Sequence, residues 1–191
     1  DAKKLKGYQI PNKTIKKYNS KVFEDKIKLI AQKILESKKP LLHLGQGVRI
    51  SKSINMYKKF IEKNKIPFSL TWNATDIIES DNPLYAGRPG AFAERGANFI
   101  VQNSDLFISI GSRLPFMVTG YNSKDFARNA YKITVDIDKN EVNKKTIDFD
   151  LRIESDAKYF IERLNKFIKI LKPNKHWINY CTYIRNKFPI V

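Results

Sequence analysis

The sequence predicts an α/β fold: a three-layer α/β/α domain in which a mostly parallel sheet of five to six strands carries helices on both faces. Short apolar runs that indicate buried strands alternate along the chain with longer segments whose apolar residues recur every three or four positions. Several of these runs end in turns that contain glycine. Strands that alternate with helices form parallel sheets with right-handed crossovers, so both faces of the sheet should be covered.

The first helix and the first strand are expected near the N-terminal end of this pattern. Helical spacing of apolar residues extends over Val22–Ser37, which predicts an amphipathic helix. The run Pro40–Gly45 is apolar and lies between a proline and a glycine, as is typical of a buried parallel strand.

The second helix and strand repeat this order. Ile54, Tyr57 and Ile61 fall on one side of a helix predicted over Ser51–Lys63, and Pro67–Trp72 is predicted to be the next strand.

A helix with small residues precedes the third strand. Ala93, Gly96 and Ala97 share a face of the helix predicted over Phe92–Asn103, so this helix can pack closely against a neighbour. The apolar run Leu106–Ile110 is the third predicted strand.

The remaining elements complete the alternation. Tyr131–Ile137 is predicted to be the fourth strand and Asp148–Ile153 a short fifth strand at an edge, followed by a strongly amphipathic helix over Asp156–Leu171. After a break at Pro173, one more helix is expected over His176–Lys187. The order as a whole predicts a Rossmann-like domain.

Length and composition indicate one globular domain in a reducing compartment. The chain has 191 residues, of which 42% are hydrophobic and 12% aromatic, enough for a single core. Its apolar runs are far shorter than the roughly 20 residues that a membrane-spanning helix needs, so no membrane span is expected. The single cysteine, Cys181, cannot form an internal disulfide. We therefore expect a cytoplasmic location.

The net charge of +17 raises the alternative of a nucleic-acid-binding domain. The lysines are scattered along helical segments beside Glu and Asp and are not gathered into one stretch. A solvated basic surface is the favoured interpretation, because a nucleic-acid groove requires a concentrated patch.

Candidate ligand-binding residues lie at the carboxyl ends of the predicted strands, where parallel sheets bind ligands. Four groups follow the predicted strands in chain order: Gly45, Gln46 and Gly47; Thr71, Trp72 and Asn73; Gly111, Ser112 and Arg113; and Asp136. A fifth group, Gly87, Arg88 and Gly90, lies in the glycine loop before the small-residue helix. Together they predict a crevice that can bind a phosphate group.

Each of these signals has a plainer structural interpretation. The turn Gly45–Ile50 lacks the third glycine of a dinucleotide fingerprint, so it could be an ordinary strand-to-helix turn. Asp136 suits a ribose, whereas Asp138 could equally cap the next helix. Arg113 suits a phosphate or a flat ring but could instead pair with a crossover helix, and Arg88 carries the same ambiguity.

The sequence offers no catalytic or metal-binding constellation. His43 lies inside an apolar strand and is expected to be a buried, hydrogen-bonded core residue, whereas His176 is expected to be exposed. With two separated histidines and one cysteine no metal site forms, and the Gly-x-Ser-x-Gly nucleophile motif is absent. The residues alone predict a ligand crevice without catalytic residues.

Five segments in order resemble the central domain of acetolactate-synthase-like, thiamine-diphosphate-dependent enzymes. They are Pro40-Leu-Leu-His-Leu-Gly-Gln-Gly-Val-Arg-Ile, Pro67-Phe-Ser-Leu-Thr-Trp-Asn, Asn82-Pro-Leu-Tyr-Ala-Gly-Arg-Pro-Gly, Asn98-Phe-Ile-Val-Gln-Asn-Ser-Asp-Leu and Val135-Asp-Ile-Asp. The resemblance extends from about Val22 to Leu171. It implies an interdomain linker over residues 1–20, a central nucleotide-binding-like domain over 21–172, and over 173–191 a C-terminal helix and linker toward a third domain.

The resemblance also implies a cofactor set and partners. Enzymes of this kind decarboxylate a small keto acid and hold thiamine diphosphate and Mg²⁺ between their first and third domains, in homodimers or homotetramers. This chain has no Gly-Asp-Gly motif, so it is expected to be inactive alone and to act with the remaining domains of the same polypeptide. In acetolactate synthases the central domain holds FAD, and the FAD-contacting positions correspond to the thirteen candidate residues given above.

One departure from the pattern concerns the acceptor substrate. Where acetolactate synthases carry two acidic residues and then an arginine that helps receive the second keto acid, this chain has Pro115, Phe116 and Met117. A thioether cannot pair with a carboxylate, so the resemblance favours a carboligase that uses another acceptor. A stand-alone nucleotide-binding regulatory module remains an alternative, which the flanking reading frame would distinguish.

Overall fold

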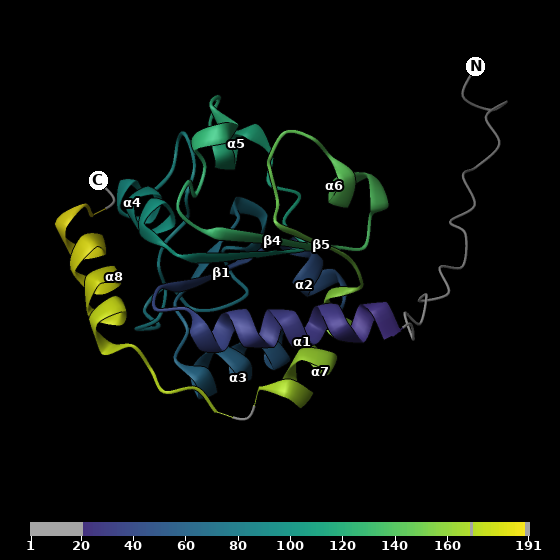
Figure 1. Cartoon of the computed structure of the whole chain (residues 1–191). Helices are drawn as coiled ribbons and strands as arrows, with labels where there is room; N and C mark the ends of the chain where they lie inside the picture. The colour runs from purple at the N-terminus through teal and green to yellow at the C-terminus, as the bar shows by residue number, and fades with distance from the viewer. Residues whose placement is uncertain (1–20, 169, 190–191) are drawn as a thin grey trace, which may run out of the picture.

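The structure is a computed structural model that describes residues 21–168 and 170–189. A five-stranded sheet in the order β2-β1-β3-β4-β5 lies between layers of helices (Figure 1). Every neighbouring pair of strands is parallel. The predicted α/β fold class is confirmed. The linker predicted over residues 1–20 lies outside the described residues.

Each of the five strands lies within or overlaps a predicted run. The strand order changes direction at the first strand. The strands are β1 (Pro40–Leu44), β2 (Phe68–Leu70), β3 (Leu106–Ile110), β4 (Tyr131–Asp136) and β5 (Leu151–Glu154). The chain adds β2 on one side of β1 and β3 on the other. A parallel sheet opens a crevice at such a reversal, beyond the carboxyl ends of the strands. β5 is an edge strand, as predicted.

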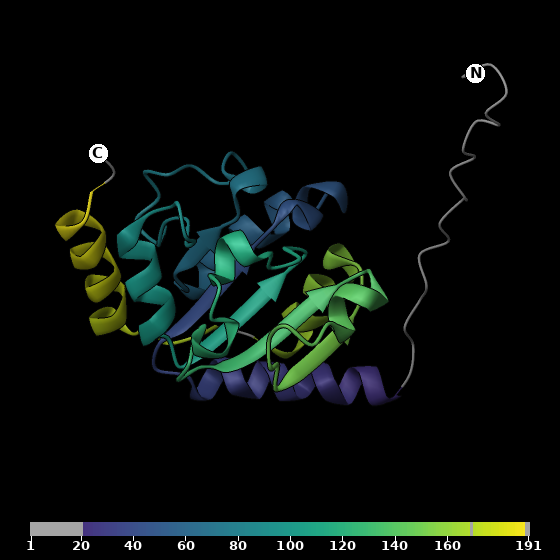
Figure 2. The ribbon, with the colours of Figure 1, turned by 90° about the horizontal axis from the view of Figure 1, so that it is seen from above.

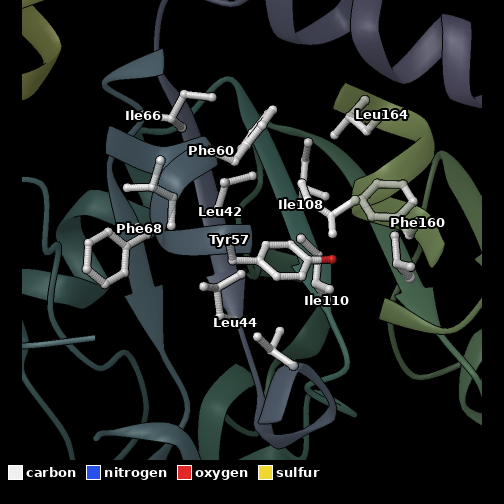
Figure 3. Packing of buried hydrophobic residues seen from close by; sticks show 14 of the residues in the cluster. Leu42, Leu44, Tyr57, Phe60, Ile66, Phe68, Ile108, Ile110, Phe160 and Leu164 are labelled. Carbon is white, nitrogen blue, oxygen red and sulfur yellow. The ribbon is translucent and has the colours of Figure 1, made fainter. Parts of the chain in front are cut away.

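Three helices cover one face of the sheet and enclose the larger core: α1 (Lys21–Glu36), α3 (Ile54–Asn64) and α7 (Ala157–Phe167). Their apolar faces meet the side chains of alternate strand residues such as Leu42 and Ile108. Figure 3 shows the Tyr57 ring beside Leu44 and Ile110 in this core. Its buried hydroxyl donates to the carbonyl oxygen of Ala157 at 2.7 Å, which ties α3 to the start of α7.

The other layer contains α4 (Arg95–Asn103) and α8 (Lys175–Lys187), which lie side by side (Figure 2). Gly96 allows this contact, because a Cβ atom there would lie 3.1 Å from the carbonyl oxygen of Ile184. The buried Trp177 of α8 donates its indole N–H to the Pro40 carbonyl oxygen at 2.9 Å. The short helices α5 (Phe116–Thr119) and α6 (Lys139–Asn143) follow β3 and β4.

A row of polar side chains crosses this second face of the sheet. Ser69, His43, Ser109 and Thr134 occupy register-paired positions on four neighbouring strands, and all four are buried. His43 Nδ1 lies 2.9 Å from Ser69 Oγ, and its ring stacks on Phe107 with centroids 5.5 Å apart. The prediction of a buried, hydrogen-bonded His43 is confirmed. His176 is exposed, as expected.

Several element boundaries differ from the predicted ones. The second strand is only three residues long, because the chain turns into a 3₁₀ helix over Trp72–Ala74. A short helix, α2 (Gln46–Ile50), occupies the stretch predicted to be a turn. α4 begins three residues later than Phe92, and α7 ends at Phe167 rather than at Leu171. Within the described residues, no helix has the length and apolar character needed to cross a bilayer.

Candidate ligand-binding site

A cavity of about 600 Å³ lies at the carboxyl ends of the strands, at the crevice that the sheet order predicts. Nine of the predicted residues line it: Gln46, Gly47, Thr71, Trp72, Asn73, Gly111, Ser112, Arg113 and Asp136. These residues come from the ends of four strands that are separated by tens of positions in the sequence. The structure therefore brings most of the candidate set to one cavity of the size that small-molecule ligands occupy.

The other four predicted residues lie elsewhere. Gly45 is buried and does not line the cavity. Gly87 and Gly90 belong to the loop before α4, where Asn98 bonds both the N–H and the carbonyl oxygen of Gly90 at 2.8 and 2.9 Å. Arg88 lines a second cavity of about 630 Å³. This cavity shares Trp72 with the first.

The glycines at the first and third strand ends are required by the packing of two turns against each other. A Cβ atom on Gly45 would lie 2.3 Å from the carbonyl oxygen of Gly111, and one on Gly47 would lie 2.7 Å from the Gly111 Cα. Gly111 itself has a φ of +57°, which favours glycine. Backbone contact between the turns is thus a sufficient reason for all three residues.

The segment after β3 places Arg113 at the cavity and has a backbone conformation that is rare for residues other than glycine. Arg113 and Leu114 both adopt positive φ angles, of 57° and 39°. The Lys144 ammonium donates to the carbonyl oxygens of both residues and also lies 3.2 Å from a Glu141 carboxylate oxygen. The Arg113 side chain is two-thirds exposed, with its guanidinium 3.9 Å from Asp138. This loose ion pair leaves the guanidinium accessible to a ligand.

Asp136 is the last residue of β4 and lines the cavity, and among the described residues one N–H group donates to its carboxylate. Its carboxylate accepts the N–H of Asp138 at 3.0 Å. Burial raises the pKa of Asp136, and the Asp138 N–H and the Arg113 charge partly offset that effect. Asp138 caps α6 by accepting the N–H of Asn140, so its capping interpretation is confirmed.

The end of the fifth strand also lines the cavity, although no residue there was predicted from the sequence. Ser155, Asp156 and Ala157 line the cavity where β5 leads into α7. The rule that identified the other strand ends applies here too, since a strand was predicted over Asp148–Ile153. Asp156 also caps α7 by accepting the N–H groups of Lys158 and Tyr159.

The walls of the cavity are mainly apolar and carry few charges. Ile50, Pro115, Met117, Val118 and Ile137 contribute side chains to the lining. Charged side chains in the lining are limited to Arg113, Asp136 and Asp156. Within residues 21–168 and 170–189, no group of three or more His, Cys, Asp or Glu side chains could hold a metal ion. The arrangement can bind a ligand with ring and hydroxyl groups but offers no metal centre.

Comparison with known proteins places this geometry in a family context. The model of the thiamine pyrophosphate enzyme central domain matches residues 27–164. The acetolactate synthase isozyme 2 large subunit of Escherichia coli (strain K12) is 35% identical over 113 residues, which are 59% of this chain and 20% of that protein. The acetolactate synthase large subunit of Lactococcus lactis is 28% identical over 171 residues, 90% of this chain and 29% of that protein.

A relative with a different name has a comparable sequence identity. The 3D-(3,5/4)-trihydroxycyclohexane-1,2-dione hydrolase of Geobacillus thermodenitrificans is 35% identical over 140 residues, 73% of this chain and 20% of that protein. The chain thus spans between a fifth and less than a third of the length of these curated relatives.

Proposed function

Because this chain belongs to the thiamine pyrophosphate enzymes, as their central domain, we propose that it is part of an enzyme that decarboxylates a 2-keto acid and transfers the resulting two-carbon unit. The resemblance of its sequence segments to acetolactate synthases agrees with the similarity to named acetolactate synthase subunits. In the proposed enzyme this domain acts as a scaffold within a homodimer or homotetramer.

Thiamine diphosphate and Mg²⁺ are proposed to bind outside this chain. The described residues lack a cluster of metal-ligating side chains, and the whole sequence lacks Gly-Asp-Gly. These residues do not fit the metal-diphosphate group. We accordingly propose that the 191-residue chain alone has no decarboxylase activity.

A flavin nucleotide, FAD, is the proposed ligand of the cavity at the carboxyl ends of the strands. The observation that supports it best is Asp136, a buried carboxylate at a strand end that accepts one hydrogen bond from the described residues, donated by the Asp138 N–H. Such a carboxylate can accept hydrogen bonds from both hydroxyl groups of a ribose. The apolar side chains of Ile50 and Val118 suit a flat ring, and Arg113 provides a guanidinium near the mouth.

Nucleotide release tests the flavin proposal. The intact protein, purified and denatured, should release FAD that chromatography and absorbance identify. Asp136→Asn should lower the bound fraction, because an amide presents one acceptor oxygen instead of two. Asp148→Asn is a matched control, since Asp148 is exposed and does not line the cavity. A colourless protein that releases no flavin would exclude FAD as the ligand.

The acceptor in the proposed reaction is a molecule other than a second keto acid. Pro115 and Met117 line the cavity and carry no charge that could pair with a carboxylate. The similarity to a hydrolase of a cyclic trihydroxydione shows that this domain also occurs in an enzyme named for a polyhydroxylated substrate.

Product analysis separates the two acceptor classes. The intact protein should consume pyruvate with an aldehyde or a keto sugar as acceptor and form little acetolactate from pyruvate alone. Acetolactate as the main product would overturn the acceptor proposal and leave the decarboxylase proposal standing. Absence of any product from pyruvate with every acceptor would overturn both.

A further inference from the structure

The segment that joins β3 to α5 carries Arg113 at the ligand cavity and has to be held in its conformation by contacts. Arg113 and Leu114 have φ angles of +57° and +39°. A leucine with a positive φ persists only where the surrounding structure holds it there. The Leu114 side chain is 3% exposed and packs in the core beneath α4 and α8. Arg113 has no such anchor, since its side chain is two-thirds exposed.

The Lys144 ammonium holds the Arg113 main chain. It donates to the carbonyl oxygen of Arg113 and, at 3.2 Å, to that of Leu114, so both carbonyl groups point toward one nitrogen. It also lies 3.2 Å from a carboxylate oxygen of Glu141, which gives its three N–H donors three acceptors. Among the described residues, no other group forms a hydrogen bond with the Arg113 main chain. The conformation at Arg113 therefore depends on Lys144.

Lys144 is itself fixed by other elements. It directly follows α6, and α6 packs against β4 and β5 (Figure 1). The Arg152 guanidinium of β5 donates to the Val142 carbonyl oxygen and, at 3.2 Å, to that of Lys144. Lys144 does not line the cavity. Any effect of Lys144 on a ligand must therefore pass through the segment that carries Arg113.

The position of Arg113 matters because the cavity lining holds no other cation among the described residues. Asp136 and Asp156 contribute carboxylates to the lining, and these repel an anionic ligand. The planar donors of a guanidinium match the oxygen atoms of phosphate groups, such as those of a nucleotide. A change in the main chain at Arg113 would move these donors, and hydrogen bonds weaken steeply when they are misaligned.

We propose that Lys144 is a positioning residue for ligand binding, which keeps the Arg113 guanidinium directed at the cavity by holding the carbonyl groups of Arg113 and Leu114. Lys144 acts through Arg113 and makes no contact with the ligand. The inference rests on the proposed flavin nucleotide for the identity of that ligand. The hold on the main chain is independent of it.

A double-mutant cycle tests the inference, with calorimetric titration of FAD into the intact, flavin-free protein. Lys144→Met removes the three N–H donors and should raise the Kd by about tenfold, because Arg113 is no longer held for its charge-assisted contact. In an Arg113→Gln background the same change should raise the Kd by less than about twofold. Lys144→Arg keeps donors at this position and should restore most of the affinity. A full loss in the Arg113→Gln background would overturn the inference, since Lys144 would then act independently of Arg113.

The matched control is Lys145→Met, which removes the same charge from the adjacent, exposed position. It should leave the Kd unchanged. An equal loss in both lysine variants would show a general charge effect and overturn the inference. Should Lys144→Met not fold, Lys144→Gln supports the same comparison, because its shorter side chain can reach fewer of the three acceptors.

Trypsin cleavage of the Arg113–Leu114 bond tests the hold on the main chain without any ligand. Mass spectrometry of the early fragments from the native protein should show faster cleavage in Lys144→Met than in Lys145→Met. Both variants lose one lysine, but only the first releases the segment and so opens it locally. Equal rates would overturn the inference. A protein that shows the faster cleavage but binds no FAD would overturn the flavin proposal alone.

Discussion

The buried histidine should make the stability of this domain depend on pH. His43 is fully buried, and desolvation lowers its pKa from 6.5 to about 3. Its Nδ1 pairs with Ser69 Oγ at 2.9 Å, while Nε2 has no partner among the described residues. The folded chain therefore keeps His43 neutral at pH values where the unfolded chain protonates it.

The sign and size of the effect follow from this difference. Stability from the neutral ring is fully present above pH 6.5 and is lost progressively as the pH falls toward about 3, because the unfolded state binds the proton first. Between pH 7 and pH 5 the loss amounts to about 2 kcal/mol. His43→Asn places an amide nitrogen near the Nδ1 position and removes the titration. Between pH 7 and pH 5 the free energy of unfolding of the wild type should therefore fall by about 2 kcal/mol more than that of His43→Asn.

Urea unfolding at pH 7 and pH 5, followed by circular dichroism, measures the difference. Other titrating groups occur in both proteins, so their contributions cancel when the two pH dependences are subtracted. His176→Asn serves as the control, because His176 is exposed and its variant should keep the wild-type pH dependence. Equal pH dependence in the wild type and His43→Asn would refute the assignment of a neutral, buried His43.

Three further outcomes are expected. Gly111→Ala should lower the thermal midpoint much more than Gly120→Ala: both residues have positive φ, but only at Gly111 would the new Cβ meet backbone, at 2.7 Å. Equal shifts would refute the packing of the two turns. Tyr57→Phe should cost about 1–2 kcal/mol in urea unfolding, because the buried hydrogen bond from its hydroxyl to the Ala157 carbonyl oxygen is lost. Cys181 should resist iodoacetamide at pH 8 in the folded protein and react after denaturation, since burial raises the pKa of its thiol to about 12; rapid labelling of the native protein would contradict this.

The periodicity of apolar residues was enough to predict most of the fold. The run Leu106–Ile110 is a strand whose five residues are all buried, and the spacing in Val22–Ser37 corresponds to α1. The errors occur where tertiary contacts decide the backbone. Gln46–Ile50 forms a short helix because its first turn packs against Gly111, a residue more than 60 positions away.

The candidate site was partly predictable for a similar reason. The rule that ligands bind at the carboxyl ends of parallel strands predicts residues such as Asp136 and Ser112 from the sequence alone. It could not predict that Arg88 and Arg113 line different cavities. The loop that carries Arg88 folds toward α8 and lines the second cavity. The pairing of Arg88 with Glu94 follows from the course of that loop and has no signal in the spacing of the two residues.

The sequence by itself determined the alternation of strands and helices, the burial of His43 and the family of the domain. These properties depend on local periodicity and on the order of short segments, which the linear chain carries directly. The tertiary structure alone decided the course of the backbone at Arg113 and Leu114, which Lys144 holds from another element, and the division of the charged residues between two cavities of opposite sign. The physical reason is that both depend on contacts between residues far apart in the sequence, which form only when the sheet and its helices assemble.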